Sequence, residues 1–419
     1  MKIRDREAPI LALFLAPILA LFLAALPVMA QTQDQTRDQT QDQTQQYSLA
    51  TLQQQAAAGN PEMQYQLALR FDRGIGTVQD FLAAVPWLET AAAQGHRGAQ
   101  NLLGRYYHLG RGGPGDRTLA EHWLSLGASD NDPGYLFDLA RALEAPREGV
   151  PDFRRAAALY ARAAEAGHIE ATVSLGVLYQ AGSGVAQDHA AARRLYEVAA
   201  KAGHPRAQNN LGLLYVRGDG VAQDYQVAAE LFTQAAETGL AEALRNLGVL
   251  HENGFGVAQD DALAAELYRR AASRVRPDTA ASTAFVFDRR LMPEEPGAEA
   301  DPDARRSAAA AGDPVAQYLT AWLILQQQDA TTAHAAATWF GKAAGKGHGP
   351  SMTNLGLMYF KGTGVPQDYV LGYMWLTLAA SMGDTSARAL VDLFQPRLTG
   401  DQLTEAQRRA KSVWASISR

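Results

Sequence analysis

The sequence repeats itself with a period of 36 residues, as Leu175, Leu211 and Leu247 show, and this period restricts the fold more than any other feature. A Leu-Gly pair recurs in one phase, and a Gly-x-Gly loop followed by an aspartate recurs behind it. Many matches in one phase indicate a repeat array in which each unit packs mainly on its neighbours. The glycines and aspartates to which we assign a structural role are Gly176, Gly212, Gly248, Gly356, Gly184, Gly220, Gly256, Gly364, Asp188, Asp224, Asp260 and Asp368.

Each unit has the apolar spacing of two helices. Small or apolar residues such as Ala207 and Leu211 fall on one helical face before the loop, and Phe232 lies on such a face behind it. We therefore predict an all-α protein, an α-solenoid of stacked antiparallel helix pairs over residues 51–384 with about nine slots. The slot at about 276–311 has lost the pattern and is either a degenerate unit or an insertion.

Two positions of the repeat have a clear physical role. Gly212 lies inside a helix, where glycine costs about 0.5–1 kcal/mol relative to alanine, so a close helix contact must require a small residue there. Ala68 and Ala140 take this place in other units. Asp224 begins a second helix, where its carboxylate can accept backbone N–H groups of the first turn. The large residues that we expect in the core of the second helices are Trp87, Trp123, Tyr160, Tyr196, Phe232, Tyr268, Trp339 and Trp375.

These residues resemble those of the Sel1-like repeat, a relative of the tetratricopeptide repeat. The family pattern A-x-x-x-L-G-x-x-Y-x-x-G-x-G-V-x-x-D stands here as residues 171–188, and its second half stands as residues 192–204. The resemblance covers roughly residues 60–383. It implies a right-handed solenoid and a non-enzymatic scaffold for protein–protein interaction. It also implies an adaptor role in assembly, signalling or exopolysaccharide regulation in the cell envelope.

The N-terminus has the features of an export signal. Basic residues precede an apolar run at residues 8–30, and the chain then becomes polar at once. We predict a signal peptide at 1–30 that is cleaved before Gln31, and a periplasmic or otherwise exported protein. The alternative is an uncleaved membrane anchor formed by residues 8–30. Residues 31–50 are rich in Gln, Thr and Asp and are expected to be a disordered linker.

The C-terminal residues 385–419 are predicted to form capping helices. Pro396 divides this stretch, and Thr399 and Gln402 have the spacing of a capping box at the start of the second helix. Such helices would cover the exposed end of a solenoid.

The sequence contains no recognisable catalytic or metal-binding motif. The chain has no cysteine, and it contains neither G-x-S-x-G nor H-E-x-x-H, so we predict no enzyme, no cofactor and no metal. The formal net charge of −6 argues against binding of nucleic acid. Stacked helix pairs are about 10 Å apart whereas zinc–nitrogen bonds are about 2 Å, so histidines of different units cannot share an ion. We interpret His96, His168, His204 and His348 as turn residues.

The surface is then the remaining place for function. The candidate partner-binding residues are Asn210, Asn246, Asn354, Arg217 and Arg245, at positions outside the apolar face of the first helices. An asparagine can donate and accept at once, which suits the backbone of a bound protein or peptide. The asparagines could instead be solvated or join neighbouring repeats. A different class of function, a β-lactamase-like or other envelope hydrolase, is the alternative, although no nucleophile stands out.

Overall fold

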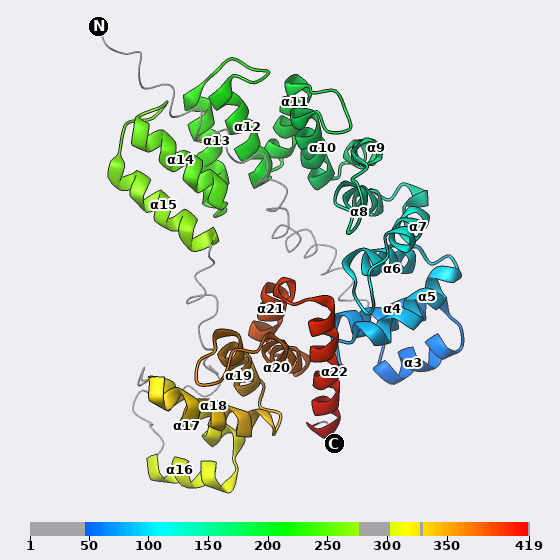
Figure 1. Cartoon of the computed structure of the whole chain (residues 1–419), viewed down its shortest axis with the longest axis vertical. Coiled ribbons are helices and arrows are strands. Elements are labelled where there is room, and N and C mark those ends of the chain that lie inside the picture. Colours follow the sequence, from blue (N-terminus) through cyan, green and yellow to red (C-terminus); the bar gives the residue numbers. More distant parts are fainter. Residues whose placement is uncertain (1–46, 276–301, 327–329, 418–419) are drawn as a thin grey trace.

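The computed structural model describes residues 47–275, 302–326 and 330–417, and within them all regular secondary structure is helical. Helices pair antiparallel and stack side by side along an α-solenoid (Figure 1). The first helices of the units are α4 (Pro61–Arg73), α6 (Arg97–Leu109), α8 (Pro133–Glu144), α10 (Ile169–Ala181), α12 (Pro205–Arg217), α14 (Ala241–Asn253), α17 (Pro314–Gln326) and α19 (Gly349–Lys361). The second helices are α5 (Phe81–Ala93), α7 (Arg117–Gly127), α9 (Phe153–Glu165), α11 (His189–Lys201), α13 (Tyr225–Glu237), α15 (Asp261–Val275), α18 (Ala330–Ala344) and α20 (Tyr369–Ser381).

Further helices flank these pairs. They are α3 (Leu49–Ala57), η2 (Ala128–Asp130), α16 (Pro302–Ala311), α21 (Thr385–Phe394), η4 (Gln395–Arg397) and α22 (Gly400–Ile417). The predicted signal peptide, the linker up to residue 46 and most of the slot at 276–311 lie outside the described residues. No helix of the described parts of the chain is both long and apolar enough to cross a bilayer.

The loop inside each unit uses its two glycines for different contacts. Gly218 ends α12 at φ +74°, and its N–H donates to the Leu214 carbonyl. Gly220 has φ +68°, and a Cβ there would lie 2.7 Å from the carbonyl carbon of His189 in the preceding unit. The first glycine therefore turns the chain, whereas the second allows close approach of the preceding helix pair.

The aspartates at the end of these loops cap the second helices. Asp224 Oδ1 accepts the N–H groups of Gln226 and Val227 at 2.9 and 3.1 Å. Such a cap stabilises a helix by about 1 kcal/mol. The same type of bond is made by Asp80, Asp116, Asp152, Asp188, Asp260 and Asp368.

Where a first helix has a glycine at the small position, this glycine faces a large residue in the second helix of the same unit. A Cβ added to Gly212 would lie 2.7 Å from Phe232 Cε1, and one added to Gly176 would lie 2.6 Å from Tyr196 Cε1. Both rings are fully buried. The helix pairs therefore approach closely because the first helix lacks a side chain at this position.

The prediction that the large residues of the second helices are core residues holds only in part for four tryptophans, which pack against the core from its edge. Trp87, Trp123, Trp339 and Trp375 are half-buried, whereas the next residue in each case is fully buried. A shift of one residue turns a helix by about 100°, so the two positions cannot share one face. The residues that fill the core are Leu88, Leu124, Phe340 and Leu376, while Tyr268 in α15 is half-buried.

The C-terminal helices differ from a simple cap over a solvent-exposed end. The N–H of Gln402 donates to Thr399 Oγ1 at 3.3 Å, and the N–H of Thr399 donates to Gln402 Oε1 at 3.0 Å, so the capping box forms. Helix α22 packs on α20 and then reaches α5 of the first unit. Figure 1 shows α22 beside the blue N-terminal helices, so the two ends of the array meet.

Candidate binding groove

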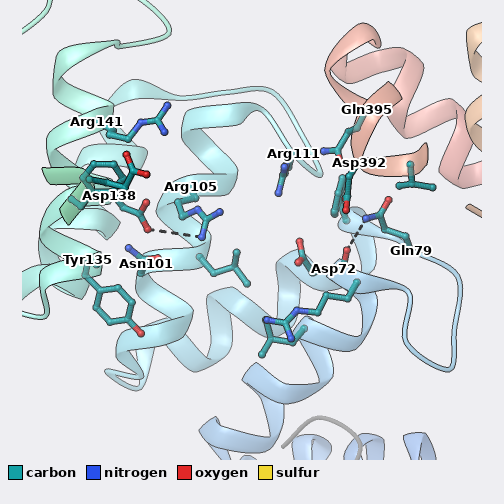
Figure 2. A pocket seen from close by; sticks show the side chains of 18 of the residues that line it. Asp72, Gln79, Asn101, Arg105, Arg111, Tyr135, Asp138, Arg141, Asp392 and Gln395 are labelled. Carbon is teal, nitrogen blue, oxygen red and sulfur yellow. Dashed lines mark hydrogen bonds and ion pairs between the residues drawn. The ribbon is translucent and has the colours of Figure 1, made fainter. Parts of the chain in front are cut away.

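The first helices α4, α6, α8 and α10 form one wall of a cavity of about 500 Å³. Residues of α20, α21 and η4 contribute to the opposite side, as Figure 2 shows for Asp392 and Gln395. We call this cavity the groove. It exists only because the ends of the array meet, since one wall comes from the first units and the other from the last.

An ion pair joins two neighbouring first helices inside the groove. Arg105 of α6 lies 3.9 Å from the carboxylate of Asp138 on α8 (Figure 2). The negative charge of Asp138 raises the pKa of Arg105 despite its burial. On α4, Asp72 accepts the hydroxyl of Tyr106 at 2.7 Å, and burial together with that carboxylate raises the pKa of Tyr106.

Aromatic rings form the part of the groove beside α8. Phe137 stacks on His168 with 4.6 Å between ring centroids, and the guanidinium of Arg141 lies 5.8 Å from the Phe137 centroid. The hydroxyl of Tyr160 donates to Glu144. This region thus combines flat apolar surface with cationic and acidic side chains.

The histidines that the sequence places in turns cap the first helices. Nδ1 of His168 accepts the N–H of Ala171 at 3.1 Å. The other capping histidines are His96, His204 and His348. His204 also lies 2.9 Å from Glu170 through Nε2. Burial would raise the pKa of Glu170, but the bond to His204 and its charge lower it. Among the described residues no cluster of three potential metal ligands occurs.

The structure does not bring the five candidate partner-binding residues to the groove. Asn246 Nδ2 donates to Asn209 Oδ1 of the preceding unit at 2.9 Å, and Asn209 Nδ2 lies 3.4 Å from Asn210 Oδ1. Asn210 is buried and Asn354 is fully buried. The alternative of bonding between repeats therefore describes Asn246, whereas Asn210 and Asn354 are buried at places that do not line the groove.

The two candidate arginines lie elsewhere on the first helices. Arg245 is exposed and lies 3.7 Å from Glu242 on its own helix. Arg217 is half-buried in the last turn of α12. Neither lines the cavity, so a role for them in binding stays a prediction.

The sequence did carry a signal for the groove, in the residue after the small Gly or Ala of each first helix. Most units have an apolar residue there, such as Leu213 and Val249, but Arg105 and Arg141 occupy this place in two consecutive units. Both arginines line the groove. A charged residue at a repeat position that is apolar in most other units was therefore the sequence signal for this site.

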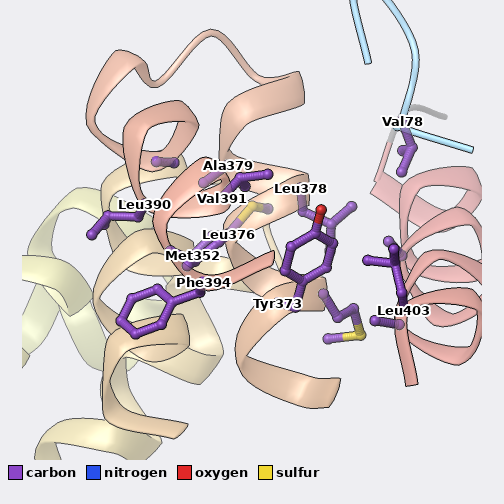
Figure 3. Close-up of a cluster of buried hydrophobic side chains, with 14 of the residues drawn as sticks. Val78, Met352, Tyr373, Leu376, Leu378, Ala379, Leu390, Val391, Phe394 and Leu403 are labelled. Carbon is purple, nitrogen blue, oxygen red and sulfur yellow. The ribbon is translucent and has the colours of Figure 1, made fainter. Parts of the chain in front are cut away.

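The side of the groove formed by α20, α21 and η4 is held in place by contacts between residues far apart in the sequence. The hydroxyl of Tyr373 on α20 donates to Gln79 Oε1 at 2.9 Å, and the N–H of Phe81 donates to Gln407 Oε1 at 3.2 Å. Figure 3 shows Val78 of the first unit near α22 at the edge of the apolar cluster that contains Tyr373. Apolar burial and buried hydrogen bonds thus hold the two ends together.

Comparison with protein families gives a repeated match. The family model described as Sel1 repeat matches residues 61–96, 98–132, 136–168, 169–204, 205–240, 241–274, 314–348 and 349–384. The stretch between residues 274 and 314, which contains most of the degenerate slot, is not matched. No curated protein matches the chain.

Two solved structures show the similarity in more detail. One is a protective antigen of uropathogenic Escherichia coli strains displaying an SLR fold, with 25% identity over 88% of this chain and 95% of that chain, and a TM-score of 0.36. The other is a Sel1 repeat protein from Oxalobacter formigenes, with 26% identity over 51% of this chain and 85% of that chain, and a TM-score of 0.46.

Proposed function

The chain belongs to the Sel1 repeat family, and from this premise we propose that it is an exported scaffold that binds another protein in the groove. The Sel1 repeat fold is a non-catalytic scaffold that generally serves protein–protein interaction. The observation that carries the proposal for this chain is the cavity of about 500 Å³ between the first helices and the C-terminal helices. Concave sites with apolar walls and a few polar groups are the usual places for ligands.

We propose the periplasm as the compartment and an adaptor role in envelope assembly, signalling or exopolysaccharide regulation. The charged start and the apolar run at residues 8–30 support export. Cell fractionation followed by N-terminal sequencing tests this proposal. A periplasmic protein that begins at Gln31 is the expected result, whereas an intact Met1 in the membrane fraction would establish the anchored form instead.

Binding in the groove is tested by photocrosslinking in living cells. A photoreactive phenylalanine replaces Tyr135, which lines the groove, and in a matched variant it replaces Val198, which is 57% exposed on α11 outside the groove. We expect a discrete crosslinked protein from position 135 and none of that mass from position 198. Equal products from both positions, or none from position 135, would refute the groove as the binding site.

We further propose that the protein acts without catalysis. The scaffold nature of the family supports this. A chromogenic cephalosporin offered to the purified protein should show no turnover above buffer. Turnover that depends on the protein concentration would favour the hydrolase alternative.

A further inference from the structure

The acidic and basic side chains of the groove differ in how well they are paired. Six carboxylate residues and six arginines line it. Asp72 and Glu144 accept tyrosine hydroxyls, Glu170 pairs with His204, and Asp138 faces Arg105. Asp132 caps α8 by accepting two backbone N–H groups at 2.9 and 3.0 Å, and Asp392 also has a partner. The acidic groups are thus all engaged within the protein.

Three of the arginines contrast with these acids. Arg111, Arg141 and Arg206 have no hydrogen bond or ion pair through their guanidinium groups within residues 47–275, 302–326 and 330–417. All three are half-buried. Arg111 lies 5.2 Å from the Phe81 centroid and Arg141 lies over Phe137, so the rings hold the guanidinium planes while their N–H groups stay available. The groove therefore has spare capacity for anions although its formal charges balance.

The same groove also contains an unused neutral donor. Asn101 is 4% exposed, and its Nδ2 has no hydrogen-bond partner in the described parts of the chain. It lies one helical turn before Arg105 on α6 and lines the groove (Figure 2). Across the groove on α20, Thr377 Oγ1 is likewise buried without a partner among the described residues. Buried polar atoms without partners are rare in folded proteins, and these two belong to residues that line the groove, so a ligand in the groove could supply their partners.

The combination of paired carboxylates and unpaired arginines favours one class of anionic ligand over others. A uniformly charged polymer would bring phosphates or uronates against the six carboxylates of the walls, which would oppose binding. A peptide can separate its acidic side chains by neutral residues and place them at the arginines only. Its backbone carbonyl groups can also accept the Asn101 amide, and its apolar side chains can contact Phe137 and Tyr135.

We propose that the groove binds an extended acidic peptide segment, with Arg111, Arg141 and Arg206 receiving its carboxylates and Asn101 a backbone carbonyl. This inference rests on the proposed function, because it names the chemistry of the partner in the same groove. It restricts the possible partners to proteins that have an exposed segment of spaced acidic residues.

The test is fluorescence anisotropy with the purified chain from residue 31 onward and three labelled peptides of about twelve residues that repeat Gly-Thr-Glu, Gly-Thr-Gln or Gly-Thr-Lys. The Glu peptide should bind at least about tenfold more tightly than the Gln peptide, because charge-assisted hydrogen bonds are lost in the latter. The Lys peptide should not bind. Equal affinity of the Glu and Gln peptides would overturn the proposal, as would an oligoglucuronate that binds as tightly as the Glu peptide.

Substitutions locate the binding site. Arg141→Gln and Arg206→Gln should each weaken binding of the Glu peptide by about tenfold, while Arg194→Gln should leave it unchanged. Arg194 is exposed on α11, outside the groove, and its guanidinium also has no partner among the described residues. Equal affinities of all three variants would contradict the assignment. Circular dichroism and melting temperature check that each variant is folded.

Asn101→Leu separates ligand binding from folding. It removes the unpaired amide, so it should weaken peptide binding while the melting temperature stays the same or rises. Unchanged affinity would remove Asn101 from the site. If the photocrosslink at position 135 captures a protein but no acidic peptide binds, the inference fails and the proposed function stands.

Discussion

Two kinds of junction hold this molecule together, one repeated between consecutive helices and one between the two ends of the array. At the repeated junction, a glycine such as Gly212 has no side chain and therefore leaves space for a ring such as that of Phe232. At the end junction, α22 and α20 meet the loop around Gln79 through the particular side chains Tyr373 and Gln407. The repeated junction builds the solenoid, whereas the end junction completes the groove.

The largest effect is expected at the repeated junction. Gly212→Leu places a branched side chain where even a Cβ would lie 2.7 Å from Phe232, so it should lower the free energy of unfolding by about 3 kcal/mol. Urea denaturation measures the change. Gly212→Ala is the graded control with a smaller loss, because Ala140 already occupies this place in a unit whose buried cluster includes Tyr160. A leucine variant as stable as the parent would show that the contact does not limit the fold.

A substitution at the end junction should lower the free energy of unfolding by less than one at the repeated junction. Gln407 is 3% exposed, and it accepts the N–H of Phe81 and donates to Gln79. Gln407→Leu leaves the buried Phe81 N–H without a partner, so a loss of about 1–2 kcal/mol is expected. Hydrogen exchange should become faster around Phe81 and stay unchanged in α12 and α13. Uniform acceleration over both regions would mean that the end junction is not a separate structural element.

The histidine caps predict a pH dependence within the repeated junctions. Burial lowers the pKa of His168 below its ordinary value of 6.5. The folded state therefore binds the proton less well than the unfolded state, so this stabilisation is present above about pH 6.5 and is lost as the pH falls through the lowered pKa. Protonation of Nδ1 also removes the acceptor for the Ala171 N–H.

The matched variant is His168→Asn, since Asn60 caps α4 in the same way without titrating. Between about pH 7 and pH 5 the parent should lose more of its unfolding free energy than the variant, because only the parent has a titrating group at this cap. Denaturation at each pH measures both proteins. Parallel pH profiles would exclude His168 as the titrating cap.

The smallest effect is expected where a cap is missing. Helix α14 begins after Leu240, which makes no capping bond through its side chain. Leu240→Asp adds a cap but loses some packing of this partly buried residue, so the net gain should be about 0.5 kcal/mol. Leu240→Ala loses the packing without a cap and should be less stable than the Asp variant by about 1 kcal/mol. Equal stability of the two variants would count against the capping account.

The difference between the junctions also explains what the sequence could predict. The roles of Gly212 and Asp224 were predictable because the same local geometry is needed in unit after unit, so the residues recur in phase. The tryptophans were expected at the centre of the core but lie at its edge, because Trp87 and Leu88 are adjacent apolar residues and periodicity alone did not decide which one is fully buried.

The groove was harder to predict, because its residues do not recur. Arg111 lies in a loop and Arg141 in a helix, and nothing in a 36-residue period relates them to Asp392 near the C-terminus. The contact between Gln79 and Tyr373 depends on the accumulated curvature of all intervening units, which a single unit does not encode. Among the asparagines that recur in phase, Asn246 bonds to the preceding repeat, which gives it a structural role.

The meeting of the two ends is the central claim, because the groove requires it. The chain has no cysteine, so paired spin labels can be placed without other substitutions. Labels at Leu82 on α5 and Ser412 on α22 report the end junction, and labels at Val198 and Glu230 on consecutive second helices provide the reference. Pulsed electron spin resonance should give a single distance distribution for the end pair that is as narrow as the reference. A broad distribution or a second, longer distance would contradict the closed array.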